Sequence, residues 1–373
     1  MSLNQIKVPF LELYPTYEEL KNEFDSAYQR VMKSGWYLLG QECETFESEF
    51  AEYCGAKHCV AVATGLDALK IALLANGIGP GDEVIVPAHT FIATWLAVSE
   101  TGAIPVPVDV RPDTANLDTD KIQTALTART KAIIPVHLYG QPADMDPMMA
   151  IAKEHNLVVI EDAAQAHGAS YKGKRCGALA DCAAFSFYPG KNLGAFSNGG
   201  AITTDNEELA KRARRLRNYG SERRYHHDEV GGNSRLDELQ SAFLRIKLNH
   251  LDEWNQRRSD LAALYCERLQ GIEEISLPVT ADWVQSAWHL FVIRTSKRDQ
   301  LQAALAEKGV QTNIHYPIPP HLSVAYQSLG LENGAFPHAE AMAGEVLSLP
   351  LGPHLKSDSV EFICEILNSL IKR

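Results

Sequence analysis

One lysine of the sequence lies where its amine could do covalent chemistry. Lys191 is the sixth residue of SFYPGKN (186–192), a turn with proline and glycine that follows the apolar run CAAF at 182–185. A lysine amine forms a Schiff base with a carbonyl compound when burial or nearby positive charge lowers its pKa. Most lysines are solvated surface groups, so the turn alone leaves an ordinary surface role open.

A pair of carboxylates stands at the end of another apolar run. Glu161 and Asp162 follow LVVI at 157–160. Open α/β sheets bind their ligands at the C-terminal ends of parallel strands. An aspartate in this place could instead cap the next helix, so Asp162 on its own has two interpretations.

A third feature joins a strand-like run to a helix-like run. Thr64 and Gly65 connect HCVAVA at 58–63 to LDALKIALLANG at 66–77. The N-terminus of a helix presents free backbone N–H groups and the positive end of its dipole, which suits a phosphate. Such a turn can also serve only as a helix cap.

Together these features match the requirements of pyridoxal 5′-phosphate (PLP). The aldehyde of PLP needs a lysine, here Lys191, and its ring nitrogen needs a carboxylate that keeps it protonated, here Asp162. Its phosphate needs N–H and hydroxyl donors, which the turn at Gly65 and the hydroxyl of Ser186 could supply. A flat side chain is needed against the ring, and His89 in PAHTFIAT follows a strand-like run.

The elements around these residues predict an α/β fold. Short apolar runs alternate with stretches of helical periodicity, which indicates crossover connections and a mostly parallel sheet. Several runs are apolar throughout, as in strands covered on both faces. The expected strands are 58–63, 83–88, 104–110, 131–140, 157–164, 182–188 and 200–205, and the expected helices are 66–77, 91–102, 145–156 and 206–220.

The sequence pattern changes after about residue 205, where the regular alternation of strand-like and helix-like runs ends, and we expect two domains. A long helical region is expected over 235–269, and strands over 288–295 and 311–318 alternate with helices over 298–309 and 359–371. We expect a large PLP-binding domain with an N-terminal segment at 1–250 and a smaller C-terminal α/β domain at 251–373. A chain of 373 residues can bury a core large enough for this division.

Composition excludes several classes of protein. The formal net charge of −12 argues against a general affinity for nucleic acid or anionic membranes. Seven scattered cysteines without a CxxC pair fit reduced thiols in a cytoplasmic protein. The first twenty residues lack a signal-peptide pattern, and no apolar stretch reaches the roughly 18 to 20 residues of a membrane span.

Several familiar motifs fail in their context. The glycines of GIGPG at 77–81 precede a strand, which predicts a turn and not a dinucleotide site. The turn at Lys191 lacks the Ser/Thr of a P-loop, and the 13 histidines show no metal-ligand spacing, so no metal is expected. His226 and His227 are interpreted as part of a loop or a substrate contact. The basic run Lys211 to Arg217 is interpreted as a solvated helix face.

With these motifs in place, the sequence resembles the DegT/StrS family of PLP-dependent sugar aminotransferases over essentially the whole chain. The segments that carry the resemblance include SGWYLLGQECETFESEFAEYCG, GIGPGDEVIVPAHTFIATW, VIEDAAQAHGASYKGK, SFYPGKNLG, GGNSRLDELQSA and HYPIPPH. The resemblance implies the fold-type-I, aspartate-aminotransferase-like architecture. It also implies a homodimer with shared active sites.

The resemblance assigns roles position by position. It makes Lys191 the Schiff-base lysine and Asp162 the partner of the pyridine nitrogen, and because position 191 is not a histidine, transamination is favoured over the family's dehydratase reaction. Many members have an aromatic residue where His89 stands. The remaining cofactor contacts implied are Gln165 at the ring hydroxyl, His89 on the ring face, Gly65, Leu66 and Ser186 at the phosphate, and Asn233 at the phosphate of the other subunit.

The resemblance also ranks the substrates. HTFIATW, RRYHHD at 223–228 and HYPIPP look most like the branch that aminates C-3 of dTDP-linked 3-keto-6-deoxyhexoses with L-glutamate. Aminotransferases of UDP-linked 3-keto sugar acids come next, then C-4 sugar aminotransferases; a dehydratase-like reaction and a non-catalytic regulator on the same fold stay open. The substrate contacts implied are Tyr188, Tyr219, Arg224, His226, His315 and Tyr316.

Overall fold

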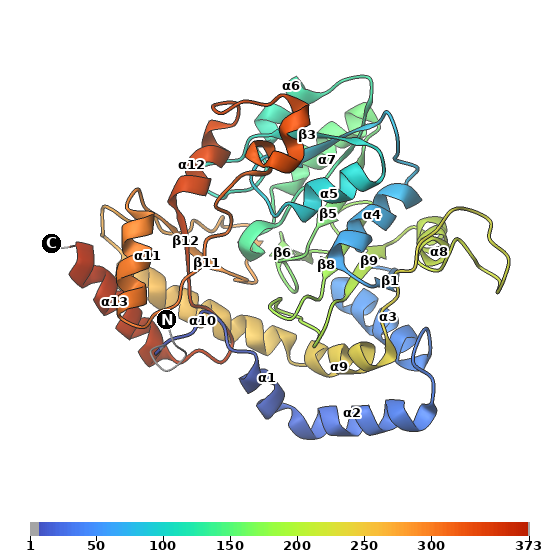
Figure 1. Cartoon of the computed structure of the whole chain (residues 1–373), viewed down its shortest axis with the longest axis horizontal. Coiled ribbons are helices and arrows are strands. Elements are labelled where there is room, and N and C mark those ends of the chain that lie inside the picture. The colour runs from blue at the N-terminus through green and yellow to red at the C-terminus, as the bar shows by residue number, and fades with distance from the viewer. Residues whose placement is uncertain (1–6, 372–373) are drawn as a thin grey trace.

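A seven-stranded sheet forms the centre of the molecule. The computed structural model describes residues 7–371, and its large sheet has the strand order β1-β9-β8-β5-β4-β2-β3 (Figure 1). Only β9 runs against its neighbours, so the predicted mostly parallel α/β sheet is confirmed. The strands are β1 (His58–Val62), β2 (Glu83–Pro87), β3 (Ile104–Val108), β4 (Thr130–Ile133), β5 (Val158–Asp162), β8 (Cys182–Ser186) and β9 (Gly200–Thr204).

Helices cover both faces of this sheet because successive strand residues point to opposite sides. Val60 and Val62 of β1 pack in the apolar cluster of α4, α5 and α8, whereas Cys59 and Ala61 pack in the cluster of α3 and α9. A third cluster lies under α6 and α7. The helices are α3 (Gln41–Cys54), α4 (Gly65–Ala75), α5 (Ala93–Glu100), α6 (Ile122–Ala125), α7 (Met145–His155), α8 (Glu207–Leu216) and α9 (Glu238–Leu248).

The C-terminal part has an apolar core of its own, built on the antiparallel pair β11 and β12. We keep the domain boundary at residue 250 as a proposal, which this separate core supports. Val8 of the N-terminal segment also packs there and pairs with Val310. The elements are α10 (Leu251–Leu269), β11 (Phe291–Arg294), α11 (Arg298–Glu307), η4 (Pro320–Leu322), η5 (Val324–Leu329), α12 (Pro337–Glu345), β12 (Val346–Leu349) and α13 (Ser357–Ile371).

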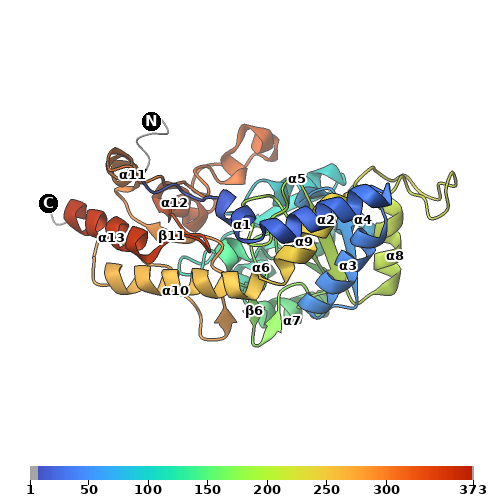
Figure 2. The same cartoon turned by 90° about the horizontal axis from the view of Figure 1, so that it is seen from below.

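Smaller elements complete the architecture. Helices α1 (Tyr14–Glu19) and α2 (Lys21–Ser34) run from the C-terminal part to α9 of the large part (Figure 2). Among residues 7–371, none of the helices combines the length and apolar character that a membrane crossing needs. The remaining elements are a three-stranded sheet of β6 (Ser170–Tyr171), β7 (Lys174–Arg175) and β10 (Val284–Gln285), and the short helices η2 (Thr119–Lys121) and η3 (Leu138–Gly140).

Three expectations about elements were wrong. The segment 311–318 is not a strand, because only Asn313 forms an isolated bridge and Pro317 offers no N–H for a ladder. The strand expected over 131–140 ends at Ile133, and Tyr139 beyond it has a left-handed backbone with φ of 59°. The helical region expected over 235–269 is confirmed, as the two helices α9 and α10. The basic run is not a solvated face throughout, since Arg217 is buried and pairs with Glu47.

Candidate active site

The turn after β8 presents the amine of Lys191. The backbone N–H of Lys191 donates to the carbonyl of Tyr188 at 2.8 Å, and the N–H of Ala195 donates to the carbonyl of Phe187 at 2.8 Å, so hydrogen bonds close the turn on both sides. Burial lowers the pKa of the Lys191 amine to about 8, against the opposing effect of the charge on Asp162. A substantial fraction of a lysine with this pKa is the free, nucleophilic amine near neutral pH.

Asp162 lies at the C-terminal end of β5, with 6% of its surface exposed. Its Oδ2 accepts a hydrogen bond from Thr94 Oγ1 at 2.8 Å, and its Oδ1 accepts one from the N–H of Ala164 at 3.3 Å. Burial raises the pKa of the Asp162 carboxyl, and these hydrogen bonds together with the Lys191 charge oppose the increase. Asp162 is therefore a buried carboxyl group whose charged form a neighbouring cation would favour.

The neighbouring carboxylate, Glu161, has a different environment. It is fully buried and accepts hydrogen bonds from the backbone N–H groups of Gly177, Leu179 and Ala180 at 2.8 to 3.2 Å. Nε2 of His137 lies 3.0 Å from the same carboxylate. These partners satisfy Glu161 and leave Asp162 as the carboxylate beside Lys191.

The N-terminus of α4 packs against the C-terminal end of β8 and the N-terminal end of β9. Thr64 caps the helix by accepting the N–H of Asp67 at 3.0 Å on its hydroxyl, which leaves the first-turn N–H groups of Gly65 and Leu66 without helical partners. A Cβ on Gly65 would lie 2.5 Å from Cβ of Ser186, and a Cβ on Gly200 would lie 2.3 Å from the carbonyl oxygen of Thr64. Only glycines allow this approach, which places the Ser186 hydroxyl next to the helix N-terminus.

His89 and Gln165 lie around a residue that the sequence analysis did not single out, Tyr139. His89 follows β2 and is 1% exposed, and its Nε2 lies 2.9 Å from the hydroxyl of Tyr139. Oε1 of Gln165 accepts the backbone N–H of Tyr139 at 2.7 Å, and its Nε2 donates to the hydroxyl of Tyr316 at 3.2 Å. The structure thus brings His89, Gln165 and Tyr316 together.

Two of the predicted substrate residues belong to this group. Nδ1 of His315 lies 2.8 Å from the hydroxyl of Ser348, and burial together with the charge on Lys191 lowers the pKa of His315 to about 4. Tyr316 contacts the rings of His89 and Phe91 at centroid distances of 6.4 and 5.4 Å. Tyr188, within the lysine turn itself, is 60% exposed.

The other predicted substrate residues lie on a projecting loop. Tyr219, Arg224 and His226 are exposed on the segment after α8, which extends away from the sheet in both views (Figures 1 and 2). Glu229 ties this loop to α8 through ion pairs with Arg212 and Arg215. The single chain therefore does not bring these three residues to Lys191. Asn233, expected to serve another subunit, is also exposed.

Two residues of the site, Thr94 and Tyr139, were not predicted from the sequence. Thr94, the hydrogen-bond donor to Asp162, lies four residues after Thr90, and the two hydroxyls are 2.9 Å apart. This i, i+4 spacing after the strand-like run EVIVPA was a usable signal. Nothing in the sequence indicated Tyr139. Its apolar neighbours predict a strand, whereas its φ of 59° lies in the left-handed region.

The residues present fit PLP on structural grounds. The cradle at Gly65, Gly200 and Ser186 offers N–H and hydroxyl donors where any Cβ would intrude. Asp162 is a buried carboxylate for a protonated ring nitrogen, and Lys191 supplies an amine. His89 Nδ1 is buried and has no hydrogen-bond partner in the described part of the chain. The individual cofactor contacts stay predictions.

Comparisons with known proteins agree with this geometry. A model described as the DegT/DnrJ/EryC1/StrS aminotransferase family matches residues 18–368. The dTDP-3-amino-3,4,6-trideoxy-alpha-D-glucose transaminase of Streptomyces venezuelae is 57% identical over 350 residues, which cover 94% of this chain and 92% of that protein. The erythromycin biosynthesis sensory transduction protein EryC1 of Saccharopolyspora erythraea is 56% identical over 362 residues, or 97% of this chain and 99% of that protein.

A solved structure has nearly the same fold as this chain. The crystal structure of S. venezuelae DesV in complex with a ketimine intermediate superposes with a TM-score of 0.97 at 54% identity. The superposition covers 99% of each chain. The fold-type-I architecture expected from the sequence is therefore confirmed.

Proposed function

Because the chain belongs to the DegT/DnrJ/EryC1/StrS aminotransferase family and is a PLP-dependent aminotransferase, we propose that it moves an amino group from L-glutamate to C-3 of a dTDP-linked 3-keto-6-deoxyhexose. The observation that carries the proposal is that the Lys191 amine, with a pKa of about 8, lies close enough to the buried carboxyl of Asp162 for each charge to shift the other's pKa. The S. venezuelae relative is a transaminase named for a dTDP-3-amino sugar, which favours a dTDP-sugar and its C-3 position.

The chemistry divides between the cofactor and the chain. Bound PLP supplies the carbonyl that takes up the amino group and a ring that withdraws electrons from the reacting carbon. Lys191 Nζ would hold the cofactor in the resting protein, and its free amine would accept and return the proton of the donor's α-carbon. Asp162 would accept a hydrogen bond from a protonated ring nitrogen, and Thr94 fixes the orientation of its carboxylate.

The walls of the site orient the substrates. The rings of His89 and Tyr316 lie 6.4 Å apart, and His315 lies close enough to Lys191 for the charge of that amine to lower its pKa. Burial excludes water, which strengthens each electrostatic contact in the site. Fixing the donor in one orientation selects which bond of its α-carbon is broken.

Other substrates and one other class of function remain as alternatives. A UDP-linked 3-keto sugar acid or a C-4 keto sugar would use the same lysine and carboxylate, and so would a dehydratase-like reaction. EryC1 is named a sensory transduction protein, which suggests a regulator on this fold. A regulator has no need of a reactive amine beside a buried carboxylate, so the Lys191–Asp162 pair favours catalysis.

The test follows nitrogen from donor to sugar. The PLP-loaded protein is incubated with ¹⁵N-labelled L-glutamate and a panel of dTDP- and UDP-linked 3-keto and 4-keto sugars, and products are measured by mass spectrometry. We expect ¹⁵N in the dTDP-3-keto-6-deoxyhexose and none with Lys191→Ala. Preferred labelling of a UDP sugar would replace the substrate assignment, deoxygenation without labelling would indicate a dehydratase, and no labelling of any sugar would favour a regulator.

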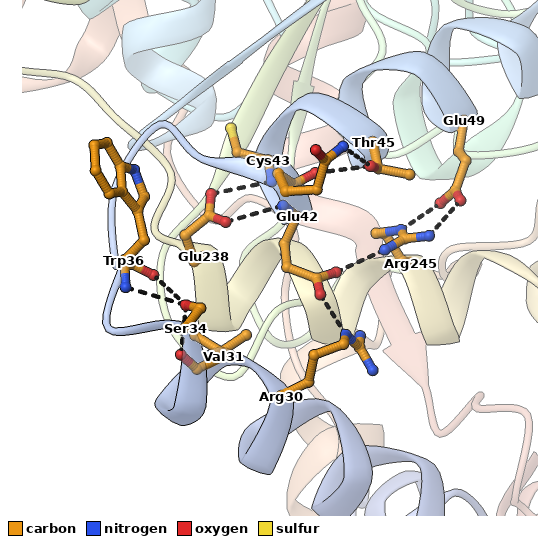
Figure 3. Close-up of polar contacts among 11 residues, drawn as sticks. Arg30, Val31, Ser34, Trp36, Glu42, Cys43, Thr45, Glu49, Glu238 and Arg245 are labelled. Carbon is orange, nitrogen blue, oxygen red and sulfur yellow. Dashed lines mark hydrogen bonds and ion pairs between the residues drawn. The ribbon is translucent and has the colours of Figure 1, made fainter.

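The chain also presents a candidate dimer surface, which we define as the loop of Trp36, Tyr37 and Leu38. These three side chains are 62%, 51% and 43% exposed. Hydrogen bonds hold the loop at both ends. Ser34 Oγ donates to the carbonyl of Val31, and Glu238 accepts the N–H groups of Glu42 and Cys43 at 2.9 and 3.1 Å (Figure 3). Glu238 also accepts the N–H of Gly40 at 2.9 Å. A rigid loop with exposed apolar side chains is typical of a protein interface.

Ion pairs fix the helices around this loop. The carboxylate of Glu42 lies between Arg30 and Arg245, and Arg245 also pairs with Glu49 (Figure 3). Leu38 forms a bridge with Asp237, four residues from Asn233. We propose that a second copy of the chain packs on this loop and that Asn233 of each copy then reaches the other's cofactor phosphate.

Two experiments test the shared site. Trp36→Glu should yield monomers by light scattering, whereas Val324→Glu, at a residue 87% exposed elsewhere, should not. Mixing Lys191→Ala with Asn233→Ala subunits should restore activity, because one site of the mixed dimer then carries both lesions and the other neither. If the mixture stays as inactive as its parents, each site is built from one chain.

The predicted cytoplasmic location stays a prediction. All seven cysteines lie within the described residues and are free thiols. Free thiols agree with a reducing compartment.

A further inference from the structure

Tyr139 joins three parts of the site with three different groups. Its hydroxyl lies 2.9 Å from His89 Nε2 and 2.5 Å from the carbonyl oxygen of His315. Its backbone N–H donates to Gln165 Oε1 at 2.7 Å, and its carbonyl accepts the N–H of Leu290 at 3.2 Å. Three parts of the site therefore contact Tyr139. They are His89 after β2, Gln165, which is expected at the ring hydroxyl, and the C-terminal part through His315 and Leu290.

Counting protons fixes the direction of each bond at the tyrosine hydroxyl. A tyrosine hydroxyl has one hydrogen to donate, and a carbonyl oxygen can only accept. The Tyr139 hydrogen must therefore go to the His315 carbonyl. His89 Nε2 must then be the donor to the Tyr139 oxygen, so the proton of the neutral His89 ring resides on Nε2.

The other nitrogen of His89 is left as an unprotonated acceptor. Nδ1 is buried and has no partner among residues 7–371. Burial lowers the pKa of His89 to about 4, so the ring stays neutral at physiological pH. A protonated imidazole would repel a protonated pyridine ring stacked on it, whereas a neutral imidazole would not.

The backbone of Tyr139 is held in an unfavourable conformation. Its φ of 59° lies in the left-handed region, which non-glycine residues seldom adopt because it is sterically unfavourable. The hydrogen bonds to Gln165 and from Leu290 hold it there. Such a conformation persists where the surroundings fix it, and here it directs the hydroxyl between His89 and His315.

We propose that Tyr139 is a positioning residue that holds His89 as the neutral Nε2–H tautomer and aligns it with Gln165 and with His315 and Tyr316. The stacking role of His89 rests on the proposed function, but its tautomer does not. Tyr139 acts through His89. It fixes the tautomer and the orientation of the neutral imidazole that would stack on the cofactor ring.

The test reads the tautomer directly. Histidine is labelled with ¹⁵N in the PLP-loaded protein, the His89 signals are assigned by their loss in His89→Phe, and ring nitrogens are recorded by NMR at pH 6 to 8. We expect a protonated Nε2 and an unprotonated Nδ1 throughout this range. A proton on Nδ1, or a cationic ring at pH 7, would overturn the proposal from the wild-type protein alone.

Variants then separate positioning from general packing. Tyr139→Phe should mix the two His89 tautomers and weaken PLP binding by about tenfold. Tyr265→Phe is the matched control, because its buried hydroxyl donates to the carbonyl of Pro350 at 2.9 Å in the C-terminal core, and it should leave His89 unchanged. A single Nε2–H tautomer in Tyr139→Phe would contradict the role of Tyr139. If the tautomer behaves as expected but no keto sugar is aminated, the proposed function fails and the positioning role stands.

Discussion

At the scale of single residues, the site depends on one amine and one carboxylate that burial shifts in opposite directions. Burial lowers the pKa of Lys191 to about 8 and raises the pKa of Asp162. Both shifts favour the neutral form, because a charged group is costly to remove from water. A protonated ring nitrogen beside Asp162 would favour the charged carboxylate and oppose the effect of burial.

Asp162→Asn tests the carboxylate. The amide retains the shape and can still accept the hydrogen bond from Thr94, but it no longer holds a proton on the ring nitrogen. We expect PLP to bind and the rate of amino transfer to fall by at least about a hundredfold, as when other charge-stabilising groups are removed. The measurement is the single-turnover rate with L-glutamate.

Asp181→Asn is the control for Asp162→Asn. Asp181 also accepts a backbone hydrogen bond at β5, from Val159 at 2.8 Å, but it lies at the opposite end of that strand. It should transfer the amino group at nearly the wild-type rate. A rate within threefold of wild type for Asp162→Asn would remove the carboxylate from the mechanism.

Lys191 and Asp162 could be predicted because each follows an apolar run and because the lysine, the carboxylate and the turn at Gly65 together match one cofactor. Tyr139 could not be predicted. Its role depends on a hydrogen bond from its hydroxyl to the carbonyl of His315, which is 176 residues away in the sequence. It also depends on a left-handed backbone at Tyr139, which the residue types of HLYG do not predict. Contacts of that length are set by packing of the C-terminal part on the sheet.

At the scale of elements, glycines decide how closely strands and helices approach. Gly200→Ala tests this, because its Cβ would lie 2.3 Å from the carbonyl oxygen of Thr64, a backbone atom that cannot rotate away. We expect loss of stability of roughly 1–3 kcal/mol, as in other overpacked sites, and weaker PLP binding. Urea unfolding and PLP titration measure the two effects.

Gly344→Ala provides the comparison. Gly344 lies in α12, and nothing lies within 4 Å of an added Cβ. Alanine in a helix should raise stability by up to about 1 kcal/mol. If Gly200→Ala were as stable as wild type and bound PLP equally well, the close approach of α4 and β9 would have no role.

Helix α9 supports the lysine turn through a second buried amine. Lys247 Nζ donates to the carbonyl of Gly194 at 2.6 Å and lies 3.9 Å from the ring centroid of Phe196. Burial lowers the pKa of Lys247 to about 7, so the folded protein holds this proton less tightly than the unfolded chain. Stability from this group is fully present above the unfolded pKa and is lost as the pH falls toward 7.

Lys247→Met should therefore change how stability depends on pH. The free energy of unfolding of the wild type, minus that of the variant, should fall by about 1.4 kcal/mol per unit as the pH drops from 9 toward 7, and should be constant below 7. Urea unfolding between pH 6 and 9 measures it, with Lys174→Met, at an exposed lysine of β7, as the control for losing an amine. A difference independent of pH would show that Lys247 is not buried as a titrating amine.

The elements themselves were mostly predictable, and the failures have physical causes. The seven strands of the large sheet were predicted from their apolar runs. The segment 311–318 has equally suitable side chains, but Pro317 interrupts the donors and His315 uses its carbonyl for Tyr139. Arg217 was assigned to solvent from its charged neighbours, whereas its guanidinium is buried against Glu47.

At the scale of the whole molecule, the charge of the chain opposes the charge of its proposed substrate. A nucleoside diphosphate is anionic and the chain carries −12, so long-range attraction does not deliver it. Cationic side chains must meet it locally, and Arg224 and His226 project on the loop after α8. A dimer in which this loop reaches the other subunit's site would place those charges where the single chain lacks them.

The most direct measurement traps the covalent link at Lys191. The PLP-loaded protein is reduced with borohydride, digested, and searched by mass spectrometry for the cofactor on each lysine. The account predicts the reduced cofactor on the peptide containing SFYPGKN, at Lys191, and its loss when L-glutamate is added first, because the donor's amine releases the lysine. A label on another lysine such as Lys247, or a label on Lys191 that glutamate does not remove, would contradict it.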